Sequence, residues 1–415
     1  MTSPTTRTGW CAGCLAAAGL LLAACGGDKQ RVSSVTITVA DHVGWVAFQD
    51  GAAPWALIQP DQAGGLVYTR KVTDASGRFG VAGVHIESGI RRDVTVIQGT
   101  VAEATAMQVG WDAETPVIVQ ASNFPASAWV FLSGSDARLD SAPGTVVPLC
   151  DDGNRDLVVM QVALPTWPSA SNLPSKAVVR RGIAVGPTTP TQTVDLGSPN
   201  PAELVDLFAV HALLPSGPGT LSADASLVTA NHTVVRLGDA SQGWFAFGEG
   251  TAPGDFYSFQ AVAGPPLVRT LRNTSTAADP GDQSFALGDI APLAGTSMTL
   301  HQVGGLQYAP SASSPPLRVF SIEMVQEAAP STDLHWQMML TVAWLSGATD
   351  YARPDFTGLP GFNPAWELQP GIEVQGLVAT FAATESVSTI ATGRGPEYVP
   401  GLRVDQAMES HTFVP

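Results

Sequence analysis

Cysteine is scarce in this chain of 415 residues, and its four positions exclude a fold held together by disulfides. Cys11, Cys14 and Cys25 lie close to the N-terminus, which leaves Cys150 alone in the rest of the chain. A single thiol cannot form an intramolecular disulfide. Because Cys150 follows an apolar run, we interpret it as a small buried hydrophobic residue rather than a nucleophile.

Positive charge is scarce as well. The chain has 20 Lys+Arg residues, of which only three are lysine, against 36 Asp+Glu residues. Its net charge is −16. Proteins that bind nucleic acids need clustered Lys and Arg to neutralise phosphates. We therefore predict no nucleic-acid partner.

Sequence motifs of common enzymes and cofactor sites are also missing. There is no Gly-x-Ser-x-Gly elbow, no His-Glu-x-x-His and no phosphate-binding Gly-rich loop before Lys-Ser/Thr. We predict no enzymatic activity and no metal, although the paired carboxylates of a glycosidase leave no local motif, so a hydrolase stays open as an alternative. The histidines are scattered singly, and we interpret each as a surface or strand residue: His42, His85, His211, His232, His301, His335 and His411.

The N-terminal residues have the layout of a secretory signal. Arg7 is the single positive charge before an apolar stretch at 9-24 that is rich in Ala and Gly. This stretch is a poor membrane-spanning helix, which would need about 20 strongly apolar residues. We predict that residues 1-24 are a cleaved signal peptide, so Cys11 and Cys14 leave with it.

The end of this stretch, Leu22-Ala23-Ala24-Cys25, resembles the lipobox of bacterial lipoproteins. The resemblance implies that the Cys25 thiol receives a diacylglycerol and that its new amino group is acylated. These covalent lipids are the only cofactor-like groups we expect, and several acyl chains hold a protein on a bilayer where one binds only marginally. In Gram-negative lipoproteins an Asp after the lipidated Cys favours the inner membrane, so Gly26 implies the outer membrane of the cell envelope.

Glycine and proline are abundant, at 42 and 32 residues, yet 45% of the chain is hydrophobic, which is too much for a disordered polymer. The Gly and Pro residues are therefore turns between short ordered segments. Apolar and polar residues alternate repeatedly, as in half-buried strands, and helical periodicity is nearly absent. We predict an all-β chain with strands at 35-39, 92-97, 129-132, 157-164, 177-185, 227-235, 267-271, 317-325 and 334-345.

Turn signals about 8–12 residues apart are typical of tandem immunoglobulin-like or transthyretin-like β-sandwiches of about 100 residues each. A propeller or a single large barrel stays open as an alternative. We predict a signal peptide at 1-24, a lipidated tether at 25-34 and four β-sandwich domains at 35-108, 109-199, 200-296 and 297-415.

Two local patterns refine this prediction. In the strand at 334-345, Trp336, Met338, Leu340, Val342 and Trp344 share one face. A short helical turn begins at 200, where Asn-Pro-Ala-Glu forms a capping box, before a strand at 207-214.

One hairpin, at 72-81, resembles that of carboxypeptidase-regulatory-like domains, in which Thr-Asp-x-x-Gly-x-Phe joins two strands. The resemblance implies a fold and no activity. From the residues alone, we expect Asp74 to cap the turn, Gly77 to supply a left-handed backbone and Phe79 to enter the core.

Residues 44-54 and 243-253 repeat each other, with identical residues at seven of eleven aligned positions. Their flanks do not align. The pattern indicates either a duplicated domain or two independent solutions to the same strand and turn.

Two sets of residues are candidates for binding. The acidic run at 151-156 could hold calcium, but Arg155 interrupts it and Asp-Gly-Asn is typical of a turn, which we favour. The tryptophans in or beside loops could stack on sugars or, as we favour, fill hydrophobic cores: Trp45, Trp55, Trp111 and Trp366.

Together these patterns predict a lipid-anchored cell-envelope protein with a non-catalytic structural, adhesive or interaction role, whose protein or glycan partner no residue names. The first alternative is a carbohydrate-binding accessory lipoprotein. The second is an extracytoplasmic hydrolase without a recognisable motif.

Overall fold

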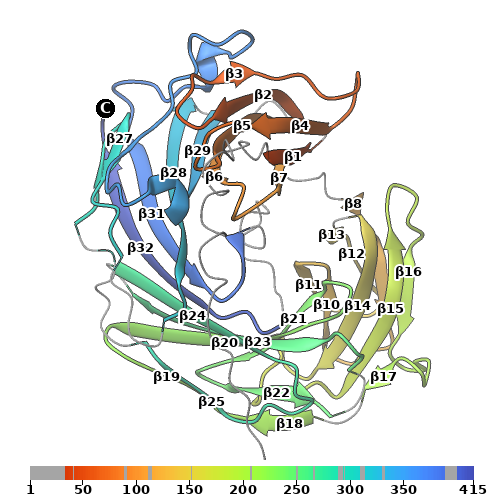
Figure 1. Cartoon of the computed structure of the whole chain (residues 1–415). Coiled ribbons are helices and arrows are strands. Elements are labelled where there is room, and N and C mark those ends of the chain that lie inside the picture. Colours follow the sequence, from red (N-terminus) through yellow and green to blue (C-terminus); the bar gives the residue numbers. More distant parts are fainter. Residues whose placement is uncertain are drawn as a thin grey trace, which may run out of the picture.

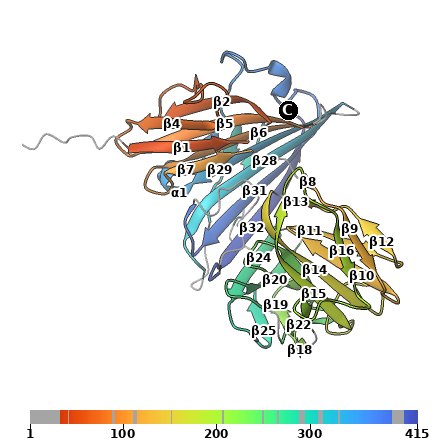
Figure 2. The same cartoon turned by 90° about the vertical axis from the view of Figure 1, so that its right-hand side faces the viewer.

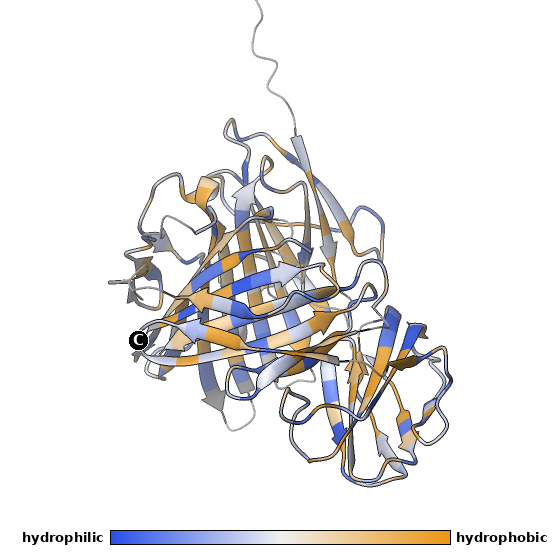
Figure 3. Cartoon of the chain, turned by 90° about the horizontal axis from the view of Figure 1, so that it is seen from below, coloured by the Kyte–Doolittle hydropathy of each residue, from blue (hydrophilic) through white to orange (hydrophobic). Residues whose placement is uncertain are grey.

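The computed structural model describes residues 33–40, 42–87, 91–110, 115–150, 152–205, 208–248, 251–264, 267–287, 293, 295–308, 314–329, 332–387 and 400–415. The all-β prediction is confirmed, since strands dominate the described residues. Figure 3 shows hydrophobic and hydrophilic residues alternating along these strands. Within the described residues, no helix is long and apolar enough to cross a membrane.

Most strands belong to one sheet of fourteen strands, which we call the main sheet. All its neighbouring strands are antiparallel except β6 and β29, which run parallel. Its strands, in spatial order, are β18 (Phe208–His211), β22 (Gly243–Phe247), β21 (Val234–Asp239), β20 (Thr220–Val228), β23 (Phe256–Gly264), β24 (Leu267–Ser275), β32 (Val404–Phe413), β31 (Val374–Ala383), β28 (Leu317–Ala329), β29 (Thr332–Thr341), β6 (Arg91–Thr100), β5 (Arg78–Glu87), β2 (Val43–Asp50) and β3 (Ala56–Leu57).

The main sheet continues across segments that the sequence divides into separate sandwiches. β6, from segment 35-108, pairs with β29, from segment 297-415. β24, from segment 200-296, pairs with β32. Three of the four segments therefore share one hydrogen-bonded sheet instead of closing separate sandwiches. Figure 1 shows this sheet curving from β2 through β28 and β32 to β22.

A small sheet covers the β2–β5–β6 end of the main sheet (Figure 2). Its strands, in spatial order, are β4 (Val67–Val72), β1 (Ser33–Val39) and β7 (Ala106–Val109), and we call it the cover sheet. Val35 and Ile37 from β1 are fully buried against Phe79 and Val81 from β5. Alternate residues of β2 face opposite sides, so that Val46 and Phe48 enter this core while Trp45 and Ala47 enter the core on the other face.

Residues 115–205 form a sandwich of their own, which we call the middle module. Val119, Val130, Leu157 and Val194 lie in the core between its sheets. The outer face of its largest sheet carries Phe131, which packs in a second core with residues of the main sheet. Its strands are β8 (Thr115–Pro116), β9 (Val119–Ser122), β10 (Ser127–Leu132), β11 (Ser135–Leu139), β12 (Gly144–Val146), β13 (Leu149–Cys150), β14 (Gly153–Val162), β15 (Lys176–Val185), β16 (Gln192–Asp195) and β17 (Leu204–Val205).

Short elements cover the remaining faces of the main sheet. β19 (Leu213–Ser216) pairs with β25 (Gln283–Ala286), and Phe285 is buried beside strands β20 to β24. The other elements lie in the segments at 295–308 and 342–372, which supply much of the core that contains Trp336: β26 (Ser297–Met298), β27 (Gln302–Gly304), β30 (Tyr351–Ala352), α1 (Val342–Leu345) and η1 (Pro364–Trp366).

The predicted strand at 334-345 is shorter than expected. Trp336, Met338 and Leu340 are fully buried as predicted, but β29 ends at Thr341. The Thr341 hydroxyl accepts a hydrogen bond from the backbone N–H of Trp344 and so caps α1. The predicted strand is too long because apolar residues continue at every second position in the sequence after Thr341, although the backbone there is helical.

Three more local predictions are wrong in detail. The predicted strand at 227-235 is a hairpin, because β20 ends at Val228 and β21 begins at Val234 around a left-handed His232. At Asn200 the capping contact forms, with the side chain accepting from Ala202 N at 3.2 Å, but β17 follows directly and no helix develops. The strand expected at 207-214 is divided between β18 and β19, which belong to different sheets.

Candidate functional site

Some predicted residues fall outside the described part of the chain. Cys25 does, and so do the rest of the predicted signal peptide and tether up to residue 32. Trp111 and Asp151 also do. Cys150 is described, and its burial confirms the interpretation of a small hydrophobic residue.

The described candidate tryptophans pack around one phenylalanine. The rings of Trp45 and Trp55 each lie 5.2 Å from the ring of Phe356. Trp366 is buried at the edge of the same cluster, and its carbonyl accepts a hydrogen bond from Trp336 Nε1 at 3.0 Å. The core interpretation is confirmed for Trp45 and Trp366, which are buried, whereas Trp55 is half-buried and packs against the same core.

The described acidic residues of the run at 151-156, Asp152 and Asp156, do not converge on one point. Asp152 is exposed and accepts a hydrogen bond from the Thr115 hydroxyl, whereas Asp156 is fully buried between the middle module and the main sheet. Within the described residues, no group of three His, Cys, Asp or Glu side chains could hold a metal ion.

Asp156 belongs to a group of charged residues that joins the middle module to the main sheet, which we call the Arg181 junction. Arg181 Nη1 lies 2.8 Å from Asp156 Oδ2, and Arg181 Nη2 lies 2.7 Å from Asp255 Oδ2. Asn231 Nδ2 donates to Asp156 Oδ1 at 2.8 Å. Burial raises the pKa of Asp156, but hydrogen bonds from Asn231, Gly182 and other donors outweigh burial, so the pKa lies below its usual value. These contacts hold the middle module on the main sheet.

Two histidines that are isolated in the sequence meet at one carboxylate on the main sheet. Asp93 of β6 lies between two histidines, with His335 Nδ1 at 2.7 Å and His85 Nδ1 at 3.8 Å from its carboxylate. Asp93 faces His85 in the β5–β6 pairing and His335 in the parallel β6–β29 pairing. The β5–β6 hairpin could have been anticipated from the sequence, but the parallel pairing brings together residues 242 positions apart.

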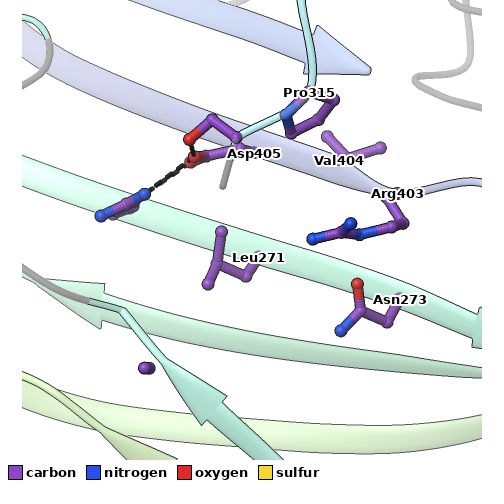
Figure 4. Close-up of a pocket in the computed structure, with 9 residues that line it drawn as sticks. Leu271, Asn273, Pro315, Arg403, Val404 and Asp405 are labelled. Carbon is purple, nitrogen blue, oxygen red and sulfur yellow. Dashed lines mark hydrogen bonds and ion pairs between the residues drawn. The ribbon is translucent and has the colours of Figure 1, made fainter. Parts of the chain in front are cut away.

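The best candidate for a ligand site is a cavity beside β24 and β32 (Figure 4). Arg269, Leu271 and Asn273 alternate along β24 and therefore share one face. Asp405 lies opposite Leu271 in the register, and continuing that register by one step places Arg403 beside Asn273. The remaining lining residues are Ala286 from β25, Ser314 and Pro315 before β28, and Val404.

At the inner end of this cavity, Arg269 and Asp405 neutralise each other. Arg269 Nε donates to Asp405 Oδ1 at 3.1 Å and Nη2 donates to Oδ2 at 2.8 Å, and Ser314 donates to the same carboxylate. The hydrogen bonds to Asp405 outweigh burial and raise the pKa of Arg269, so this guanidinium stays charged. A planar, two-point pair of this kind is stable in a buried site because both ions are hydrogen-bonded.

At the outer end lies the exposed side chain of Arg403. Among the described residues, no carboxylate pairs with its guanidinium, and only its backbone groups form hydrogen bonds. Figure 4 shows Arg403 and Asn273 on the same side of the strands as Leu271. The cavity therefore combines a neutralised ion pair, a guanidinium that no described carboxylate pairs with, and an amide. Nothing local in the sequence indicates this site, because four separate segments form it, at 269–273, 286, 314–315 and 403–405.

Comparisons with known proteins add little to this geometry. No family model and no curated protein matches the chain. One similar solved structure is described as "Ca2+-stabilized adhesin helps an Antarctic bacterium reach out and bind ice". The match covers 92% of this chain and 98% of that chain, with 10% identity and a TM-score of 0.12. A likeness this weak carries no argument about function or calcium.

Proposed function

We propose that this chain is a lipid-anchored cell-envelope protein with a non-catalytic structural, adhesive or interaction role. The supporting observation is the short distance between the lipobox and the fold. Seven residues, 26–32, separate Cys25 from the start of β1 at Ser33. Fully extended, they span about 25 Å, so lipid on Cys25 would hold the protein close to the bilayer.

The organisation of the body supports an interaction role. The main sheet joins three segments of the chain, and the Arg181 junction and a shared core attach the middle module to it. Described parts that are joined by these contacts present their surfaces in constant positions, which suits adhesion or assembly with a protein or glycan partner. Gly26 after the lipidated Cys favours the outer membrane.

Metabolic labelling with an alkyne fatty acid tests the anchor. We expect label on the wild-type protein, none on the Cys25→Ser variant, and full label on the matched Cys150→Ser variant, whose thiol is buried in the middle module. Label that survives in Cys25→Ser would contradict lipidation at this residue.

Two further measurements test the role. Crosslinking in intact cells is expected to capture a protein or glycan partner with the anchored wild type and to lose it with Cys25→Ser, because release from the membrane separates the two. Turnover of chromogenic esters, glycosides or peptides by the purified protein would contradict a non-catalytic role.

A further inference from the structure

We propose that the cavity beside β24 and β32 binds a small organic carboxylate, with Arg403 and Asn273 as the residues that contact its oxygens. The proposal is independent of the lipid anchor, because every residue that carries it belongs to the folded body.

The charge of the site indicates a monoanion. Arg269 and Arg403 contribute two positive charges and Asp405 one negative charge, which leaves one positive charge. Asp405 is already satisfied by Arg269 and Ser314, so it does not compete for Arg403. In a chain with a net charge of −16, an Arg without a carboxylate partner among the described residues is a selective place for an anion.

The shape of the donors favours a carboxylate over a phosphate. A guanidinium presents its N–H groups in a planar fork that matches the two oxygens of a carboxylate. The Asn273 amide, beside Arg403 in the register, adds one more N–H donor. Phosphate carries more charge than the site can neutralise, and it has no apolar part to contact the side chains of Leu271 and Pro315.

The size of the cavity sets the size of the ligand. Its volume is about 60 Å³. At about 10–15 Å³ for each water-sized group, this is room for roughly four to six non-hydrogen atoms, which is the range from acetate to lactate. The site therefore takes a small free acid, or the carboxylate end of a sugar acid whose ring stays outside.

Isothermal titration calorimetry of the purified full chain with sodium acetate tests the proposal. We expect a dissociation constant on the order of 1 mM. Acetamide, which has the same shape without the charge, is expected not to bind. Glucuronate distinguishes the two sources of carboxylate: binding at least as tight as that of acetate indicates a sugar acid, and weaker binding indicates a small free acid.

Variants assign the binding to this cavity. Arg403→Gln is expected to weaken acetate binding about tenfold or more, and Arg403→Lys to restore it only in part, because Lys keeps the charge and loses the fork. Arg138→Gln removes the same charge from an exposed Arg of the middle module and is expected to bind like the wild type. Asn273→Ala is expected to weaken binding less than Arg403→Gln does.

Three results would overturn the proposal: no heat with acetate, equal affinity in wild type and Arg403→Gln, or inorganic phosphate binding as tightly as acetate. Because Arg403 is exposed and its side chain forms no hydrogen bond with a described residue, we expect its substitution to leave the fold intact. Unchanged thermal unfolding of Arg403→Gln without ligand is the check on folding.

Discussion

At the scale of single residues, the buried ionic groups decide how stability responds to pH. Asp156 has no exposed surface and is held by Arg181, Asn231 and the N–H of Gly182. All of these partners donate hydrogen bonds and therefore favour the ionised carboxylate, and this effect exceeds the cost of burial. The folded chain thus holds Asp156 ionised at a pH where the unfolded chain would protonate it.

Asp156→Asn tests this coupling. The pKa of Asp156 is lower in the folded chain than the value of about 3.9 expected in the unfolded chain. Ionised Asp156 therefore adds to the free energy of unfolding above about pH 4, and this contribution is lost as the pH falls below that value. We expect the variant to lose about 1–3 kcal/mol at pH 7 and to show a shallower fall in stability from pH 5 to pH 3. Urea unfolding at several pH values measures both. Asp140→Asn, in an exposed pair, is the control, and an unchanged slope in Asp156→Asn would contradict the assignment.

At the scale of elements, the hairpin at 72-81 shows why turn residues could be interpreted from the sequence. Asp74 Oδ2 accepts hydrogen bonds from the N–H groups of Ser76 and Arg78, both at 3.0 Å, and Phe79 is fully buried. Gly77 has a φ of 71° and so adopts the left-handed conformation expected of it. All three expectations are confirmed, because turn chemistry depends on neighbours a few residues away.

Gly77→Ala measures the requirement for glycine at this turn. An added Cβ would strain the left-handed backbone and lie 2.7 Å from Val101 Cγ2. We expect a loss of more than about 1 kcal/mol in the free energy of unfolding, measured by chemical denaturation. Gly134→Ala is the matched control, since a Cβ added there would meet no heavy atom within 4 Å, and we expect a change within about 0.5 kcal/mol. Equal effects of the two substitutions would show that the left-handed turn is not the cause.

At the scale of the whole molecule, the main sheet joins distant parts of the chain. Parallel pairing of β6 with β29 connects segment 35-108 to segment 297-415, and β24 with β32 connects the latter to segment 200-296. At both junctions the backbone groups of one strand are hydrogen-bonded to its neighbour. Separating the segments would therefore break a row of backbone hydrogen bonds at each junction.

Native-state hydrogen exchange tests this unity. We expect the amides of β6, β29, β24 and β32 to share one high free energy of opening, because they exchange only when the whole main sheet opens. The middle module, with its own core, is expected to show a separate value. Faster exchange of the whole segment 35-108 as one unit would instead support the division predicted from the sequence.

The sequence by itself determined the all-β class, the strands whose side chains alternate and the turn at Asp74 and Gly77. These features depend on contacts within a strand or a turn, so a local pattern is enough to specify them. Only the tertiary structure decided that β6 pairs with β29, that His85, Asp93 and His335 meet, and that Arg403 lies beside Asn273. Alternation specifies which face of a strand is buried, but backbone hydrogen bonds are the same for every strand, so the choice of neighbour depends on the packing of the whole chain.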